Sequence, residues 1–414
     1  MGHYTFFVLL SVITAISSYL NFRYLKLPKS IGLIIVSALV SLLLFTSMNI
    51  EPQLFTPVYK MLNSLDFKEV VLKGMLGYLL FASAMHLSFV DLKKYLSNIL
   101  TFASVGVLIS TFIIGTICWL IAPIILNDYI PYSVCLLVGA IISPTDPVTV
   151  FAVFKKNQNV PEKVKSVLIG ESLFNDVISI VLFVVLVSMI FSTGDYLTAN
   201  KIIMLFLREG LGGIALGVLI GYIGIWFMHR ADDGQTLIII SLALVSFGFW
   251  LAEQVTVSGP LVMVVTGLII GNSNFRNKLS RRSKHTLNSF WFIIDELLNT
   301  FLFVLVGIEI LEMKYTTGLI IAALIGFFVT IVARYVSVTL PMLFLERKVN
   351  KDFWKNSFAM TWGGLRGGVS IALALSIPFS EKHSITFSVI YITVLLSIFI
   401  QGITFKPILD KLYK

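Results

Sequence analysis

The sequence predicts an all-α polytopic membrane protein with about 13 transmembrane helices. Of its 414 residues, 57% are apolar and only 13% are charged, and the mean hydropathy is +0.93. A helix needs about 20 apolar residues to cross the bilayer core. Stretches of that length without a charged residue recur along the chain, as at 5–22, 30–50, 95–127 and 254–275. The strands of a membrane barrel would instead alternate polar and apolar residues over about ten positions, so the pattern excludes a barrel as well as a soluble domain.

The apolar runs define the helices when they are read against the turn residues between them. The first run has no basic region before it and no small-residue cleavage site nearby, so we expect a retained helix rather than a signal peptide. Few residues follow the last run, and we expect one membrane unit over 1–414 with no soluble regulatory domain. In chain order the predicted helices are 4–20, 29–49, 70–87, 97–126, 132–154, 164–192, 203–228, 235–252, 256–271, 288–311, 316–344, 354–378 and 384–408.

The net charge of +9 comes from basic residues that lie mainly in loops, so we expect a lipid bilayer and no nucleic acid as the partner. With the amino terminus outside, the inward loops hold 22 lysines and arginines and the outward loops hold 7. Basic residues favour the cytoplasmic side. The predicted location is the cell (inner) membrane, with the amino terminus outside and the carboxyl terminus in the cytoplasm.

Two of the predicted helices contain residues that interrupt a helix. The fifth contains Ser143-Pro144-Thr145-Asp146-Pro147 near its middle, and the twelfth contains Gly363-Gly364-Leu365-Arg366-Gly367-Gly368. Proline removes a backbone donor and glycine is a poor helix former. Such residues also produce ordinary kinks, but two breaks that each hold a charge inside the membrane favour a common architecture.

The positions of the breaks in the helix order predict two inverted repeats with crossed discontinuous helices 5 and 12. The two helices are seven apart, an odd number, so they cross the membrane in opposite directions. Paired interrupted helices indicate the midplane site of a transporter. Where such helices cross, like helix ends meet, each with about half an elementary charge. We expect Asp146 to compensate the positive ends and Arg366 to compensate the negative ends.

The sixth helix carries two carboxylates, Glu171 and Asp176, which point about 140° apart on a helix. Ser172 shares a face with Asp176, and Asn175 adds an amide oxygen, so this face offers hard oxygen ligands. A charged carboxylate at mid-membrane costs at least about 2.5 kcal/mol. We therefore expect Asp176 to bind a proton or a cation, and Glu171 to form a structural ion pair with Arg334 of the eleventh helix.

The tenth helix carries Asp295, Glu296 and Asn299, followed by Glu309 near its outer end. For Asp295 and Glu296 two interpretations stay open: an inward vestibule or a structural polar contact. Glu309 is interpreted as an interfacial charge.

These motifs together resemble the NhaP-type sodium/proton antiporters, bacterial relatives of the animal sodium/proton exchangers. The resemblance spans nearly the whole chain. It rests on the two interrupted motifs and on two further segments, Gly170-Glu171-Ser172-Leu173-Phe174-Asn175-Asp176 and Ile294-Asp295-Glu296-Leu297-Leu298-Asn299. One position departs from the pattern: many relatives have a glutamate where this chain has Ala82, which leaves its cation preference open.

The resemblance implies a role for each site residue. Asp176 would alternate between proton and sodium, with oxygens from Thr145, Asp146 and Ser172 completing the sodium site. Asn175 would be held by Glu171, which pairs with Arg334, and Arg366 would balance the second break.

The function that the resemblance implies is secondary active antiport of a monovalent cation for protons, with sodium favoured and lithium or potassium as alternatives. It further implies electroneutral one-for-one exchange and an elevator-type homodimer. The mobile core would cover about 97–192 and 316–408, and the dimerisation scaffold about 1–90 and 203–311. No cofactor is expected.

Two other functions compete with antiport. A cation-coupled symporter of an organic solute could share the architecture, because helix amino ends can bind a carboxylate, but Asp146 beside Asp176 argues against an anion. A membrane-embedded enzyme would need clustered carboxylates at one membrane surface or a base–nucleophile pair. The sequence shows neither, so an enzyme is not expected.

Overall fold

The fold is all-helical in a computed structural model of the chain, which describes residues 3–50, 69–126, 129–146, 150, 153–154, 159–191, 199–231, 233–273, 279–309, 316–345, 349, 351–377 and 383–414. No strand occurs among these residues. The helices of the first half are α1 (His3–Leu20), α2 (Lys29–Ile50), α4 (Leu76–His86), α5 (Phe89–Thr101), α6 (Val107–Leu126), α7 (Tyr132–Ile142) and α9 (Glu162–Phe191).

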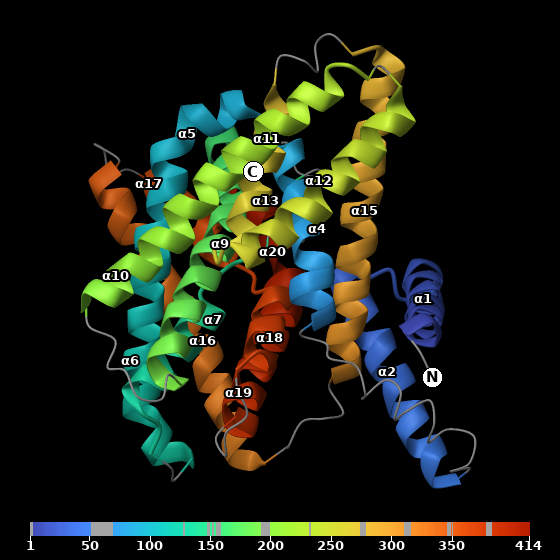
Figure 1. Ribbon diagram of the computed structural model, residues 1–414. Helices are drawn as coiled ribbons and strands as arrows, with labels where there is room; N and C mark the ends of the chain where they lie inside the picture. Colours follow the sequence, from blue (N-terminus) through green and yellow to red (C-terminus); the bar gives the residue numbers. More distant parts are fainter. Residues whose placement is uncertain are drawn as a thin grey trace.

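The second half begins with α10 and ends with α20 (Figure 1). Its helices are α10 (Ala199–Leu207), α11 (Gly213–Met228), α12 (Gly234–Gln254), α13 (Gly259–Asn272), α15 (Arg281–Ile308), α16 (Thr317–Leu345), α17 (Lys351–Trp362), α18 (Gly368–Leu375), α19 (His383–Leu396) and α20 (Gly402–Leu412). Short π-helical turns join several neighbours, at Asn21–Leu25, Glu69–Met75, Phe102–Gly106, Arg208–Gly212 and Ser397–Gln401.

Each predicted range overlaps a helix, but several boundaries differ. The predicted helix 97–126 corresponds to α5, a π turn and α6. It begins at Phe89 rather than 97 because α5 continues toward the amino terminus past a kink at Tyr95. The predicted helix 288–311 begins at Arg281, where the Ser280 hydroxyl caps the first turn by accepting a hydrogen bond from the backbone of Ser283 (3.0 Å). Eight helices of the described part are long and apolar enough to cross a membrane. The count of thirteen crossings remains a prediction.

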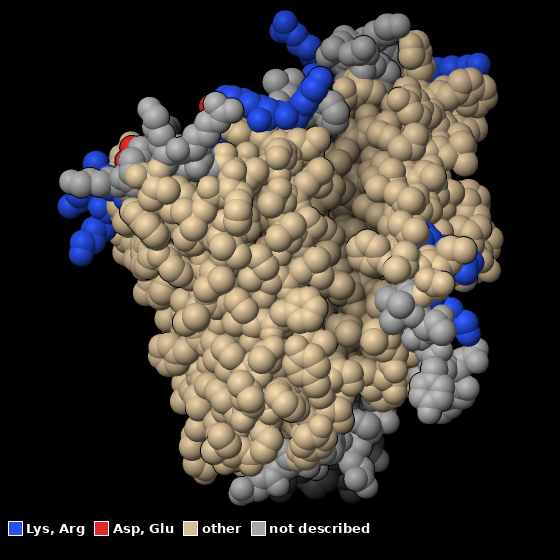
Figure 2. Space-filling model, turned by 90° about the vertical axis from the view of Figure 1, so that its left-hand side faces the viewer, with Lys and Arg blue, Asp and Glu red and all other residues tan. Residues whose placement is uncertain are grey.

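The surface has the character of a membrane protein. Large apolar side chains such as Phe22, Ile124 and Phe344 are more than three-quarters exposed. Figure 2 shows a broad face almost free of charged side chains, with lysines and arginines gathered along its upper edge and right-hand margin. Such a face is stable in contact with lipid rather than water.

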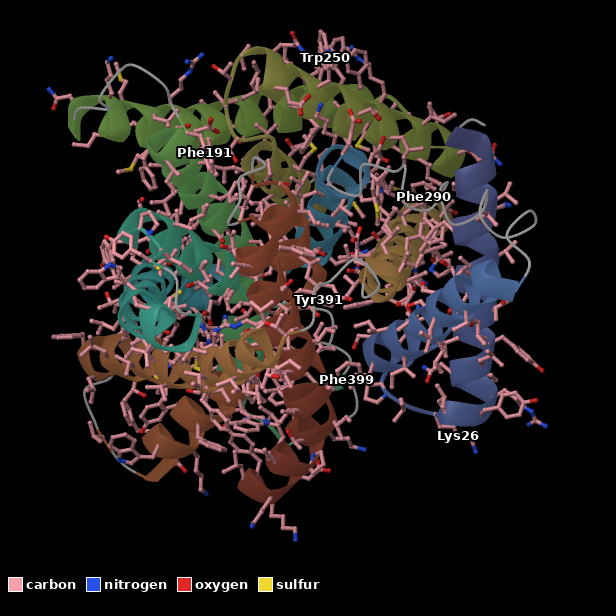
Figure 3. The ribbon with its side chains drawn as sticks, turned by 90° about the horizontal axis from the view of Figure 1, so that it is seen from below. Lys26, Phe191, Trp250, Phe290, Tyr391 and Phe399 are labelled. Carbon is pink, nitrogen blue, oxygen red and sulfur yellow. The ribbon has the colours of Figure 1, made fainter. Side chains whose placement is uncertain are left out.

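The helices pack as two groups. In the first, α1, α2, α4, α11, α12, α13 and α15 contact one another, and in the second, α5, α6, α7, α9, α16, α17, α19 and α20 do so, with α18 against α7 and α19. Figures 1 and 3 place α1 and α2 on the opposite side of the molecule from α6, α7 and α16. Tyr391 of α19 lies near the middle in Figure 3, and its hydroxyl donates to the carbonyl of Val306 in α15, which links the groups.

Helix α4 packs closely against α13, and this packing fixes the face that α4 turns toward the second group. A Cβ atom at Gly267 of α13 would lie 2.6 Å from the carbonyl oxygen of Phe81 in α4, so only glycine allows this approach. The same packing buries Ala82 completely. It presents Leu79, Leu80 and Ser83 of α4 to the space between the groups.

Candidate functional site

The first break follows directly from Pro144. Proline cannot donate the hydrogen bond that a helix would direct to the carbonyl four residues earlier, that of Ala140. The hydroxyl of Ser179 in α9 donates to this carbonyl instead. Helix α7 therefore ends at Ile142, and the chain runs non-helically through Asp146. Pro147 lies outside the described residues.

The second break replaces its lost backbone bonds in a similar way. Helix α17 ends at Trp362, and helix α18 begins at Gly368 after five residues without helical structure. The side chain of Gln401 donates to the carbonyl of Trp362 (3.3 Å), and the backbone N–H of Arg366 donates to the hydroxyl of Ser397 (3.0 Å). Polar side chains thus satisfy the opened backbone inside the membrane, as the absence of water requires.

The two breaks cross in direct contact. The backbone N–H of Asp146 donates to the carbonyl of Leu365 (2.7 Å). The Arg366 guanidinium is buried and donates to the carbonyls of Ser143 and Pro144, the latter at 3.2 Å. Its positive charge therefore lies at the carboxyl end of α7, where the helix dipole is negative.

Asp146 lies at the opposite pole of the crossing, next to the amino end of α18. A Cβ atom at Gly367, the residue that precedes α18, would lie 2.9 Å from the Cβ of Asp146. The side chain of Asp146 is therefore adjacent to the positive amino end of α18. Asp146 and Arg366 occupy the two positions that compensation of the helix ends requires.

A buried hydrogen-bond network joins the first break to α9. The side-chain nitrogen of Asn175 donates to the hydroxyl of Thr145 (2.8 Å), and the backbone N–H of Thr145 donates to the Asn175 oxygen (3.4 Å). The hydroxyls of Thr145 and Ser172 are 2.8 Å apart. The expected contact of Asn175 with Glu171 is replaced by this pairing with Thr145.

Asp176 and Asp146 line one cavity of about 40 Å³, enough for roughly two or three water molecules. Asp146 is 9% exposed and Asp176 is 8% exposed. The remaining polar wall comes from Ser83, Asn299 and the segment Gly367–Ser370, and leucines of α4, α9 and α15 complete it. Thr145, Ser172 and Asn175 lie behind this wall, in contact with one another.

Glu171 is turned away from the cavity and forms a bidentate ion pair with Arg334 of α16. The guanidinium Nη1 contacts Oε1 of Glu171, and Nη2 lies 2.9 Å from Oε2. Both side chains are buried, and Nη2 also lies 3.5 Å from the carbonyl of Met360 in α17. The pair therefore ties α9, α16 and α17 together.

Asp295 and Glu296 occupy different environments. Asp295 accepts hydrogen bonds from the hydroxyl of Ser83 (3.3 Å) and from the side chain of Asn299 (3.1 Å), which places it directly behind the cavity wall. Glu296 is exposed and pairs with Lys29 of α2. Asp295 thus makes a polar contact between α4 and α15, whereas Glu296 makes a surface ion pair.

Sequence reasoning missed Ser83 and Ser370 as parts of this wall. Ser83 comes from a helix without a break or a charged residue. Ser370 could have been noticed as the first polar side chain after the second break. Among the described residues, no group of three or more His, Cys, Asp or Glu side chains could hold a metal ion. The carboxylates and the serine hydroxyls of the lining offer oxygen ligands, which suit a proton or a hard cation.

Discontinuous helices that cross beside buried carboxylates, in a multi-pass membrane protein, define the secondary transporters with inverted repeats. The family model described as "Sodium/hydrogen exchanger, transmembrane" matches residues 9–411. The chain belongs to this sodium/hydrogen exchanger family.

Individual relatives are similar over nearly their full length. The Na(+)/H(+) antiporter NhaP of Pseudomonas aeruginosa is 36% identical over 406 residues, which cover 97% of this chain and 95% of that protein. The Na(+)/H(+) antiporter NhaH of Halobacillus dabanensis is 29% identical and covers 98% and 97%. The structure of the sodium proton antiporter MjNhaP1 from Methanocaldococcus jannaschii shares the fold, with a TM-score of 0.73 and 22% identity over 99% of this chain and 98% of that one.

Proposed function

We propose that this protein exchanges sodium for protons across the cell membrane, and that Asp176 is the group that binds them in alternation. The observation that carries the proposal is the placement of Asp176 and Asp146 in one buried cavity at the crossing of the two breaks. The names of the relatives support sodium and protons as the ions. Lithium and potassium remain alternative cations.

The chemistry of the exchange is competition for one carboxylate. A proton bound to Asp176 removes the charge that a cation needs, and a bound cation excludes the proton. Asp146 lies at the positive amino end of α18, so its negative charge is compensated whether Asp176 holds a proton or a cation. The resemblance of the Asn175-Asp176 pair to the NhaP-type pattern supports electroneutral exchange, in which one proton leaves for each sodium ion that enters.

The two packing groups support an elevator-type movement. The cavity takes Asp146, Asp176 and Ser370 from the group that contains α7, α9 and α18, and Ser83 and Asn299 from the group that contains α4 and α15. Sliding of the group that contains α7, α9 and α18, about 97–192 and 316–408, along the group that contains α4 and α15, about 1–90 and 203–311, would carry the two carboxylates past a fixed wall. A homodimer formed through the group that contains α4 and α15 would hold that wall in place. In the proposed orientation the amino terminus is outside and the carboxyl terminus is in the cytoplasm.

Symport of an organic anion is the alternative function. An anionic substrate would meet two carboxylates in a cavity of about 40 Å³, and repulsion in a medium that screens poorly opposes its binding. The charge of the wall therefore favours a cation.

The experiment that tests the proposal uses purified protein in liposomes loaded with a pH-sensitive dye. We expect a sodium gradient to drive proton movement in the wild type, and Asp176→Asn to reduce it to the level of empty liposomes. Asp410→Asn is the matched control, because it removes an exposed carboxylate on α20 and should leave transport intact. Sodium-dependent proton movement retained in a folded Asp176→Asn protein would contradict the site.

A further inference from the structure

The helix after the second break contributes Ser370 to the lining of the ion cavity. Ser370 lies in the first turn of α18, lines the cavity with Asp146 and Asp176, and is 1% exposed. Within the described part of the chain, no hydrogen-bond partner reaches its Oγ atom. Buried hydroxyls in proteins are nearly always hydrogen-bonded, because an unpaired one destabilises the fold. This oxygen atom therefore fits a ligand that occupies the cavity.

The other polar groups of the wall differ from Ser370 because they already have partners. The hydroxyl of Ser83 and the side-chain nitrogen of Asn299 both donate to the carboxylate of Asp295. Ser172 and Thr145, which lie behind the wall, are hydrogen-bonded to each other through their hydroxyls. Ser370 offers the two lone pairs of a neutral oxygen in the wall of the cavity that the two carboxylates also line.

The charge of the cavity decides which kind of ligand this oxygen takes. The amino end of α18 contributes about half a positive charge, whereas Asp146 and Asp176 contribute up to two negative charges. The net charge of the cavity is negative when both carboxylates are ionised, so the cavity attracts a cation. A hard cation gains from each additional oxygen that replaces its water.

We propose that Ser370 is a ligand of the transported cation, supplied by the second discontinuous helix. This assignment rests on the proposed antiport function and extends it. The cation is then held between both breaks, by Asp176 and Asp146 on one side and by Ser370 on the other. A proton bound to one carboxylate oxygen needs no such ligand, so Ser370 determines the affinity for the cation and not for the proton.

The test compares the sodium dependence of transport in liposomes for Ser370→Ala and for the wild type. We expect the apparent KM for sodium to rise about 3- to 10-fold, because the variant loses one contact whose free energy is similar to that of a hydrogen bond. The maximal rate should change little. Ser370→Thr keeps the hydroxyl and should retain the wild-type KM. Ser370→Cys replaces it with a soft ligand and should behave like Ser370→Ala.

Ser388→Ala is the matched control. Ser388 of α19 is also 1% exposed, its hydroxyl also has no partner among the described residues, and it does not line the cavity. Its replacement should leave the KM for sodium unchanged. An equal rise in the two alanine variants would overturn the assignment, because it would reflect packing rather than ligation.

A second measurement separates binding from transport. Sodium should raise the Tm of the detergent-solubilised wild type, as ligands of the folded state do, and raise that of Ser370→Ala less at the same concentration. An unchanged KM and an unchanged sodium-induced Tm shift in Ser370→Ala would overturn the Ser370 assignment alone. A wild type without sodium-dependent proton movement would instead overturn the proposed function.

Discussion

At the residue scale, two carboxylates on the same helix have different partners. Glu171 is buried against Arg334 in a bidentate pair, so neither charge is left uncompensated. Asp176, five residues later and on another face of α9, faces the cavity with Asp146 instead. A carboxylate whose two oxygens are held by a guanidinium is not free to bind a cation, whereas a carboxylate without a fixed cationic partner is. The surroundings of these two acids therefore separate a structural role from the proposed transport role.

This distinction predicts that Arg334→Ala lowers stability first and transport only as a consequence. Removal of one partner leaves the Glu171 charge buried and unpaired, which typically costs about 3–5 kcal/mol. Thermal unfolding in detergent should show a large drop in Tm. Glu171→Gln combined with Arg334→Met removes both charges and should recover much of the loss. A stable Arg334→Ala protein that merely transports slowly would contradict the structural role of the pair.

At the element scale, the crossing depends on close approach of two open backbone segments. The hydrogen bond from Asp146 to Leu365 and those from Arg366 to Ser143 and Pro144 join the breaks. Each break supplies what the other lacks: a carboxylate near a positive helix end and a guanidinium near a negative one. The crossing is therefore a single unit rather than two independent kinks.

For this unit we predict that Gly367→Ala impairs transport. The new Cβ would lie 2.9 Å from the Cβ of Asp146, and such overpacking costs about 1–3 kcal/mol. The displaced Asp146 should weaken sodium binding, seen as a higher KM for sodium and a lower Tm. Gly210→Ala is the control, because no atom lies within 4 Å of the Cβ added there. Equal effects of the two substitutions would argue against a tight crossing.

The sequence predicted the elements of this site better than their contacts. The breaks were predictable because Pro144 and the glycines after Trp362 act locally on the backbone. The pairing of Glu171 with Arg334 followed from the need to compensate a buried charge. The bonds of Asn175 to Thr145 and of Ser83 to Asp295 depend on how helices distant in sequence pack, so no local pattern indicated them. Ser370 was missed because a single serine is common in membrane helices.

At the scale of the whole molecule, the cavity lies where the two packing groups meet. Helices α4 and α15 form one wall, and α9, α18 and the first break form the other. A site inside either group would move with all of its ligands. A site between the groups exchanges one wall for another when they slide, which suits alternating access. The fold thus explains why the carboxylates belong to one group and the apolar wall largely to the other.

If one carboxylate binds either a proton or a sodium ion, protons must be released when sodium binds. Calorimetric titration of the detergent-solubilised protein in buffers of different ionisation enthalpy measures the number of protons released. At a pH where the site is protonated, we expect one proton released for each sodium bound, and neither binding nor release in Asp176→Asn. Sodium binding to the wild type without proton release would contradict competition for one carboxylate.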